Sequence, residues 1–417
     1  MSSRFDADRR VVITGLGILS PIGIGKDAFW SSALAGQSGI ATSQELVDHG
    51  LNTTAMGIVT GTIGHPKLVP GKLKRLDRMT QLAMVAACEA LDDCGGFGGA
   101  NPEDIAVVVG SGVGGHETME DTMRRANAGR PIHPMSLPRT MGSAAGAHIA
   151  EIVNGKGPNM TINTACSSGI NAIGTALDLI RSGRARKAVV GGVEACSRPF
   201  MVVGFSALRA LSTGYNDQPM TASRPFDKGR DGFILSEGAA MFTLELESDA
   251  RAAGKTIYAA LDGFGSSCNA NDIVVPDVNG EIQAMTAALL DADCSPDGID
   301  YLNPHATSTP LGDKVEVEAI KAVFSERAAS LPISATKSLI GHSIGASGAI
   351  GLAATVLSMR DNRLHPTINY ETPDPECDLD FVPNVARDHV VNGAMVNAFG
   401  FGGNNASLVV NAVQESV

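Results

Sequence analysis

Two short segments far apart in the sequence share one pattern, and this repeat constrains the fold more than any other feature. Residues 166–169 are Cys-Ser-Ser-Gly and residues 342–345 are His-Ser-Ile-Gly, and each segment opens a helical pattern rich in small residues. A short apolar run that indicates a buried strand precedes each one. The sequence therefore predicts two related halves whose helix starts face each other, one carrying a cysteine and the other a histidine.

Strand and helix patterns alternate along both halves. In the first half, strands are expected at 105–109, 158–162 and 187–193, and this βαβαβ order predicts parallel strands covered by helices on both faces. The second half repeats the alternation from residue 257 onward. A charged stretch at 247–255 is the expected boundary, so we expect one half over residues 1–255 and the other over 256–417.

Two glycine pairs, Gly15 with Gly17 and Gly263 with Gly265, end the first strand pattern of each half, and both pairs predict turns. The first pair resembles a dinucleotide-binding fingerprint. However, Ser20 replaces the third glycine of that fingerprint and a proline follows it, so no Rossmann site is expected.

Composition excludes several classes of protein. The 417 residues carry a formal net charge of −12, which disfavours nucleic acid as a partner because phosphate binding needs a concentrated basic face. No apolar run approaches the roughly 20 residues that span a bilayer. The charged N-terminus, Met1 to Arg10, is unlike a secretory signal, which favours a cytoplasmic protein. Seven cysteines without CxxC spacing argue against a disulfide framework and against a zinc ribbon.

Cys166 is the candidate nucleophile. It would lie where a strand meets a helix start, and free N–H groups together with the helix dipole lower the pKa of a thiol at such a place and provide donors for an oxyanion. The alternative is that this cysteine, like many others, only packs in the core.

A second candidate site is a cluster of four cations just before a helical pattern at 79–94. These cations are Lys72, Lys74, Arg75 and Arg78. They form either a solvated helix entry or a docking surface for an acidic protein.

Taken together, the motifs resemble the elongating β-ketoacyl-(acyl carrier protein) synthases, condensing enzymes with the thiolase fold. The resemblance covers nearly the whole chain. It is carried by five segments in the same order, at 164–169, 223–232, 305–309, 336–342 and 397–403. It implies a layered αβαβα core with two pseudo-symmetric halves, a homodimer, and an acyl carrier protein as partner.

The resemblance also implies a mechanism. An acyl group would pass from the carrier phosphopantetheine to Cys166, whose backbone N–H and that of Phe401 would form the oxyanion hole. His305 and His342 would then donate to the thioester oxygen while malonyl-carrier protein loses carbon dioxide and attacks the acyl group. The product is a 3-oxoacyl chain on the carrier. No metal or redox cofactor is expected, and the spacing of these residues is foreign to zinc sites.

Finer roles follow from the same resemblance. Lys337 would hold the charge state around His305, and Thr307 and Thr309 would bind the pantetheine amides. Phe401 would gate the cysteine, and Val113 would limit the depth of the acyl pocket.

The chain departs from the family pattern near these residues. Gly351 stands where a glutamate usually partners the lysine, and residues 269–274 replace a usual aspartate, histidine and threonine. Asn404 replaces a usual threonine. These changes predict an unusual substrate or altered carrier recognition.

Two alternative functions are compatible with the resemblance. One is a non-catalytic partner resembling a chain-length factor, although such partners typically lose the cysteine that this chain keeps. The other is a thiolase-like acyltransferase that uses coenzyme A. Thiolases usually carry a second catalytic cysteine near the C-terminus, and Cys377 lies in a loop-like stretch without that motif.

Overall fold

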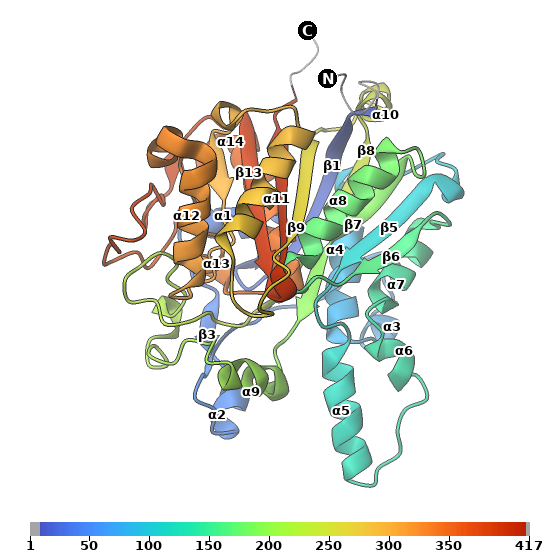
Figure 1. The fold of residues 1–417 in the computed structure, drawn as a ribbon. Helices are drawn as coiled ribbons and strands as arrows, with labels where there is room; N and C mark the ends of the chain where they lie inside the picture. Colours follow the sequence, from blue (N-terminus) through green and yellow to red (C-terminus); the bar gives the residue numbers. More distant parts are fainter. Residues whose placement is uncertain (1–8, 414–417) are drawn as a thin grey trace.

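The structure, a computed structural model, describes residues 9–413 as a layered α/β fold built on one ten-stranded mixed sheet (Figure 1). From edge to edge its strands are β10 (Tyr301–Asn303), β13 (Gly393–Gly400), β14 (Asn404–Asn411), β9 (Ala259–Cys268), β1 (Val11–Ser20), β8 (Glu237–Leu246), β7 (Lys187–Ala195), β5 (Ile105–Gly110) and β6 (Asn159–Ile162), with β2 (Gly23–Ile24) paired to β1. As the βαβαβ order predicts, β5 pairs in parallel with both β6 and β7. The segment Met1 to Arg10, whose charges were compared with a secretory signal, lies mostly outside the described residues.

The two halves of the chain follow the same path through this sheet. Shorter elements aside, the first half runs β1, α4, β5, α7, β6, α8, β7 and β8, and the second runs β9, α11, β10, α12, residues 332–335, α14, β13 and β14. The helices are α4 (Arg78–Asp93), α7 (Ala144–Val153), α8 (Ser168–Arg181), α11 (Val278–Asp291), α12 (Gly312–Phe324) and α14 (Ser347–Asp361). Residues 332–335 form only an isolated bridge, from Ile333 to Leu302, where a strand was predicted. The pseudo-symmetric halves are thus confirmed, whereas the boundary at residue 255 stays a prediction.

Three apolar clusters separate the layers. One surrounds α8 and α14, a second lies between the sheet and the pair α4 and α7, and a third lies between the sheet and the pair α11 and α12. Alternate residues of β5 divide between two of them, since Val108 belongs to the α8 cluster while Val107 and Val109 belong to the α4 cluster. This arrangement confirms the predicted αβαβα core.

Small residues bring the starts of α8 and α14 together. A Cβ added at Gly169 would lie 2.7 Å from the carbonyl oxygen of Gly345, and one added at Gly348 would lie 2.5 Å from Ile170 Cγ1. No larger side chain fits at these contacts. The prediction that the two helix starts face each other is therefore confirmed.

The prediction of turns at the two glycine pairs is wrong. Gly15 and Gly17 lie inside β1, and Gly263 and Gly265 lie inside β9. A Cβ at Gly15 or Gly17 would lie 2.2 or 2.0 Å from a carbonyl oxygen of α4, and one at either Gly263 or Gly265 would lie 2.2 Å from a carbonyl oxygen of α11. Each pair lets a helix backbone rest directly on its strand, which is a packing requirement that mimics a turn signal.

The remaining elements connect these layers. One connecting helix is α1 (Lys26–Leu34). Three others, α5 (His116–Asn127), α6 (Ser136–Thr140) and α9 (Pro199–Ala207), were not predicted. The other elements are α2 (Gln44–Asp48), α3 (Pro70–Leu73), α10 (Glu247–Ala252), α13 (Lys337–Ile340), β3 (Ile40–Thr42), β4 (Ala55–Gly57), β11 (Arg363–Leu364) and β12 (Arg387–Asp388). Within residues 9–413 no helix is long and apolar enough to cross a membrane.

Candidate active site

Cys166 lies in a tight turn between β6 and α8. The turn, Ala165–Ser167, is a 3-10 helix that begins with Ala165 at a positive φ of 52°. Non-glycine residues seldom adopt this conformation, so the surrounding structure must hold it in place. The Cys166 side chain is buried in the turn, and the residue is 8% exposed.

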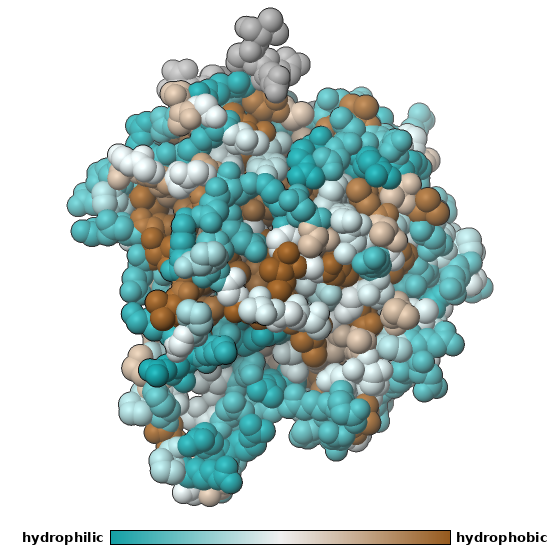
Figure 2. Space-filling view, turned by 180° about the vertical axis from the view of Figure 1, so that it is seen from behind, coloured by the Kyte–Doolittle hydropathy of each residue, from teal (hydrophilic) through white to brown (hydrophobic). Residues whose placement is uncertain are grey.

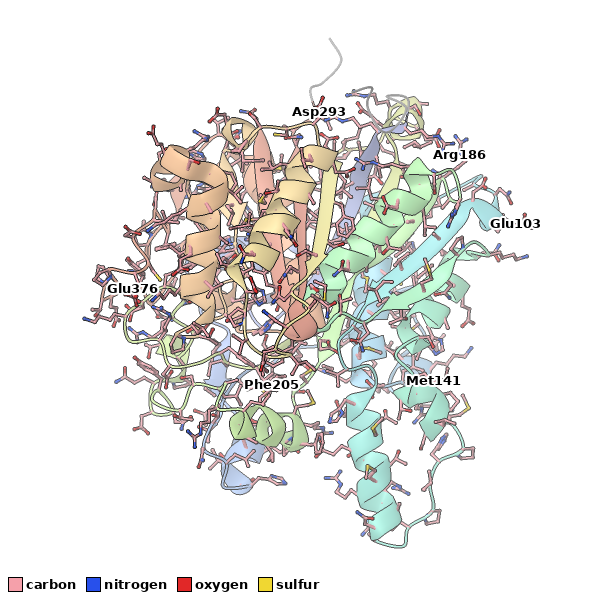
Figure 3. The ribbon with its side chains drawn as sticks, in the orientation of Figure 1. Glu103, Met141, Arg186, Phe205, Asp293 and Glu376 are labelled. Carbon is pink, nitrogen blue, oxygen red and sulfur yellow. The ribbon has the colours of Figure 1, made fainter. Side chains whose placement is uncertain are left out.

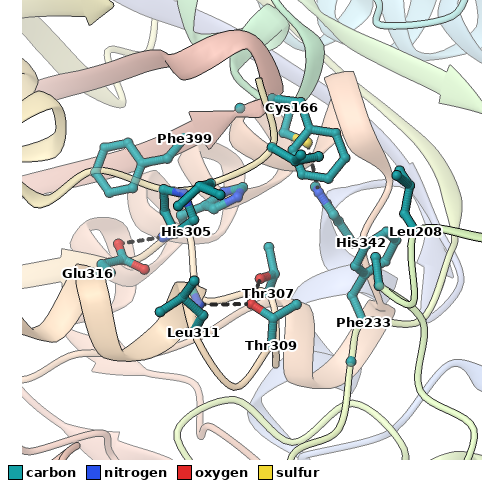
Figure 4. Close-up of a pocket in the computed structure, with 18 of the residues that line it drawn as sticks. Cys166, Leu208, Phe233, His305, Thr307, Thr309, Leu311, Glu316, His342 and Phe399 are labelled. Atoms are coloured by element: carbon teal, nitrogen blue, oxygen red, sulfur yellow. Dashed lines mark hydrogen bonds between the residues drawn. The ribbon is translucent and has the colours of Figure 1, made fainter. Parts of the chain in front are cut away.

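Both predicted histidines reach this thiol (Figure 4). His342 Nε2 lies 3.1 Å from Cys166 Sγ, and the rings of His342 and His305 meet edge to face with their centroids 5.4 Å apart. One ligand-type atom from each of the three residues lies within 4.8 Å of the others. The structure thus brings the predicted triad together from three separate segments. That the site works without a metal stays a prediction.

Ser347 fixes the orientation of His342. Its Oγ accepts a hydrogen bond from the backbone N–H of Ser343 at 2.9 Å and lies 2.8 Å from His342 Nδ1. Because the serine proton is free to be donated to Nδ1, the ring proton is assigned to Nε2, which points at Cys166. Burial and the Lys337 cation lower the pKa of His342 well below its ordinary value, so the ring is neutral.

The loop of His305 is held by two charged groups. Lys337 donates from Nζ to the carbonyl oxygen of His305, and Glu316 accepts from the backbone N–H groups of His305 and Ala306, each at 2.7 Å. Burial, Lys337 and His342 lower the pKa of His305 well below its ordinary value. His305 Nδ1 is buried without a hydrogen-bond partner among the described residues, so its ring remains available to a ligand.

The prediction of a lowered thiol pKa is wrong for the free protein. Burial raises the pKa of Cys166 to about 11, although Lys337 and the backbone N–H groups of Phe401 and Cys166 act in the opposite direction. Loss of solvation therefore outweighs the helix start. The same two N–H groups are those expected in the oxyanion hole. Gly400 allows their approach, since a Cβ there would lie 3.0 Å from the Cys166 nitrogen.

A cavity of about 410 Å³ leads to this thiol. Thr307 and Thr309 line it with their hydroxyl groups 3.0 Å apart, and Phe401 also lines it. Binding of the pantetheine amides by the two threonines stays a prediction. Val113 does not line the cavity; it packs against the apolar cluster that contains Cys166. Phe205, which Figure 3 labels just above α9, lies 6.3 Å from Phe401 between ring centroids.

Three of the four predicted docking cations are exposed. Lys72, Lys74 and Arg75 face solvent at and after α3, and no carboxylate within the described chain pairs with them. Arg78 does not belong to this set. Its guanidinium group donates to both carboxylate oxygens of Glu237, which is buried.

Sequence reasoning missed Ser347, Glu316 and Glu281, the last of which also lines the cavity. Glu316 had a signal, because it begins the second turn of the helix that follows the His305 loop, where a carboxylate can reach back to loop N–H groups. Ser347 and Glu281 had none, since a serine among small residues and a glutamate in a first helix turn are both common.

Comparison with known families identifies two adjoining domains. Residues 8–250 match the model "Beta-ketoacyl synthase, N-terminal domain" and residues 258–371 match "Beta-ketoacyl synthase, C-terminal domain". Among similar curated proteins, the 3-oxoacyl-[acyl-carrier-protein] synthase 2 of Staphylococcus aureus (strain COL) is 42% identical over 407 residues, covering 96% of this chain and 98% of that protein. The protein of the same name from Coxiella burnetii is 40% identical over 410 residues, covering 97% and 99%.

Solved structures give the same picture. A β-ketoacyl synthase from Burkholderia phymatum STM815 superimposes with a TM-score of 0.90 at 33% identity, covering 97% of this chain and 100% of that one. A type II polyketide ketosynthase bound to its acyl-carrier protein also reaches a TM-score of 0.90, at 32% identity, with 97% and 100% coverage.

Proposed function

Since the chain belongs to the β-ketoacyl synthase family, we propose that Cys166 carries an acyl group which is condensed with malonyl-carrier protein to give a 3-oxoacyl-carrier protein. The observation that carries the assignment of residues is the 3.1 Å contact between His342 Nε2 and Cys166 Sγ, with His305 beside it. The class of enzyme is an acyltransferase. The site needs no metal or redox cofactor for this reaction, because two neutral imidazoles provide the hydrogen-bond donors.

The first half-reaction transfers the acyl group. The Cys166 sulfur attacks the thioester carbon of the carrier, the new S–C bond forms, and the bond to the pantetheine sulfur breaks as that sulfur takes up the thiol proton. The N–H groups of Cys166 and Phe401 stabilise the oxyanion. Because burial raises the pKa of the free thiol, the thiolate is a minor species before the carrier docks.

The second half-reaction forms the carbon–carbon bond. The malonyl thioester loses carbon dioxide, and the electron pair moves to an enolate oxygen that accepts hydrogen bonds from His305 and His342. The enolate carbon then attacks the Cys166 thioester, and the sulfur of Cys166 leaves as a thiolate that takes up one proton from solvent to restore the thiol. Burial, together with the Lys337 cation, keeps both rings neutral, and Lys337 also holds the His305 loop. Thr307 and Thr309 line the path of the pantetheine arm.

The two alternatives receive less support. A non-catalytic partner would not need the contacts among Cys166, His305 and His342 that the structure shows. For a coenzyme A thiolase, a second cysteine should face the site, but Cys377 is fully buried in the apolar cluster between the sheet and α12 and does not line the cavity.

Intact-mass spectrometry tests the proposal directly. Incubation with acyl-carrier proteins should add one acyl group to the wild type and none to Cys166→Ala. An adduct that persists in the variant would contradict the assignment. Turnover with malonyl-carrier protein but not with malonyl-coenzyme A would separate the proposed reaction from the coenzyme A alternative.

Carrier docking is proposed at Lys72, Lys74 and Arg75, whose exposed charges suit an acidic protein.

A homodimer is proposed through β6, which ends the sheet and leaves one row of backbone groups unpaired. On the same side, the arm of α5 and α6 extends from the body (Figure 1), and the view from behind shows hydrophobic residues among hydrophilic ones at that edge (Figure 2). Met141, which Figure 3 labels on this side of the molecule, is an exposed hydrophobic residue with 51% of its surface accessible.

Sedimentation should therefore find a dimer at micromolar concentration, and a monomer would count against the β6 interface. We also propose a cytoplasmic location, where carrier proteins and reduced thiols are available.

A further inference from the structure

Glu281 is a buried acid in the active-site cavity with no evident structural partner. It lies in the first turn of α11, is 2% exposed, and lines the same cavity as Cys166 and His305. Its Oε2 has no hydrogen-bond partner within residues 9–413. A buried polar atom left unpaired costs about 1–3 kcal/mol, so a group in this position is expected to meet its partner in a complex.

The neighbours of Glu281 connect it to other residues of the cavity wall and to the support of the His305 loop. The preceding residue, Gly280, abuts two amides that also line the cavity, since a Cβ there would lie 1.9 Å from Asn269 Oδ1 and 2.6 Å from Asn405 Nδ2. One turn further along α11, Met285 accepts a contact from the amide of Asn397, which also donates to Glu316. Glu316 in turn holds the backbone of the His305 loop, as Figure 4 shows.

The charge of the cavity wall determines what this carboxyl group can bind. Burial, with the nearby carboxylates Glu316, Asp277 and Asp313, raises the pKa of Glu281 well above its ordinary value, which favours the protonated acid. Arg209 is the one lysine or arginine among the described residues that line the cavity, and it is exposed. A carboxylate that enters the buried part of the cavity therefore depends on neutral donors.

We propose that Glu281 binds the free carboxylate of the extender unit, donating its acid proton in a charge-assisted hydrogen bond. This inference rests on the proposed condensation, which brings one malonyl carboxylate into the cavity in each cycle. Glu281 would thereby distinguish a carboxylated thioester from an acyl thioester on the same pantetheine arm.

The kinetic consequence follows from when the bond exists. The hydrogen bond is made to the ground-state carboxylate and is lost as carbon dioxide leaves. It therefore strengthens substrate binding without accelerating decarboxylation. Removing it should raise KM for malonyl-carrier protein and, where decarboxylation limits turnover, raise kcat with it, so that kcat/KM changes little.

The test compares the dissociation constants of two unreactive ligands, carrier proteins bearing amide-linked malonyl or acetyl groups. Wild type should prefer the malonyl form, and Glu281→Leu should reduce that preference by about tenfold or more. Glu281→Met, an unbranched replacement, serves if the leucine variant does not fold. Glu281→Gln keeps a neutral donor and should retain the preference to within about threefold. Gln283→Leu, at an exposed position of the same helix, is the matched control.

A preference unchanged or increased in the leucine or methionine variant would overturn the proposal, as would an equal loss in Gln283→Leu. Acylation of wild-type Cys166 by a simple acyl-carrier protein tests the proposed function separately and should proceed. Loss of that acylation in the wild type would instead contradict the proposed function, so the two failures are distinguishable.

Discussion

Ser347→Ala is expected to slow decarboxylation more than acyl transfer. The Ser347 hydroxyl group accepts from the N–H of Ser343 at 2.9 Å, and with the ring proton assigned to Nε2 its own proton is donated to His342 Nδ1 at 2.8 Å. This bond holds the ring proton on Nε2, where it can be donated to the enolate oxygen. With alanine at this position, nothing in the contact fixes the tautomer.

The magnitude can be worked from these two contacts. Loss of one neutral hydrogen bond that orients the ring costs about 1 kcal/mol, or about fivefold in rate. If the two neutral tautomers then become equally populated, the productive fraction falls about twofold more. The decarboxylation rate should therefore drop about tenfold, with KM for malonyl-carrier protein unchanged because Ser347 does not line the cavity.

The assay is carbon dioxide release from malonyl-carrier protein, measured beside single-turnover acylation of Cys166. Ser347→Thr keeps the hydroxyl group and should recover most of the activity. Ser358→Ala removes a buried hydroxyl group from the same helix, one that donates to Ala354 O at 2.9 Å away from the triad, and should leave the rate unchanged. A wild-type rate in Ser347→Ala would refute the tautomer argument, and so would an equal loss in Ser358→Ala.

Two further predictions follow from the charges around the site. Lys337→Met should slow iodoacetamide alkylation of Cys166 at pH 7, where Lys337 still carries its charge because burial lowers its pKa only to about 8. Removal of the cation raises the thiol pKa further, and the thiolate fraction falls about tenfold for each unit of pKa. An unchanged or faster rate would contradict the role of Lys337. Lys74→Glu should raise KM for the carrier about two- to tenfold at low salt without changing kcat. Arg184→Glu, at another exposed position, is the control, and equal effects of both variants would point to net charge instead of a docking surface.

The framework of the site was predictable from the sequence because it depends on local patterns. Hydrophobic periodicity and a high content of small residues predict the strand before Cys166 and the helix after it. The same signals predict the repeat at His342. Pseudo-symmetry then brings the two helix starts together. His305 could be placed only by resemblance, since the loop that carries it has no periodic signal.

What could not be predicted depends on tertiary burial. The helix start at Cys166 favours a low thiol pKa, yet the finished fold removes water from the sulfur, and burial decides the sign. The role of Gly15 and Gly17 could not be predicted for the same reason. Close packing against α4 and a tight turn both require glycine, so the two cannot be distinguished in the sequence. Glu281 looks like an ordinary first-turn acid until the cavity is known.

At Gly351 the chain lacks the glutamate of the family pattern, and neighbouring residues compensate for its absence. The glutamate expected there would pair with Lys337, but a Cβ at this position would already lie 2.6 Å from Asn303 Oδ1. Asn303 is held by its own hydrogen bond to Thr336 Oγ1 at 2.8 Å, one residue before the lysine. The carboxylate that acts on Lys337 comes instead from Glu316, whose charge opposes the lowering of the lysine pKa by burial. Glu316 on α12 therefore provides the negative charge that acts on Lys337. The amide of Asn303 fills the space beside Gly351 of α14.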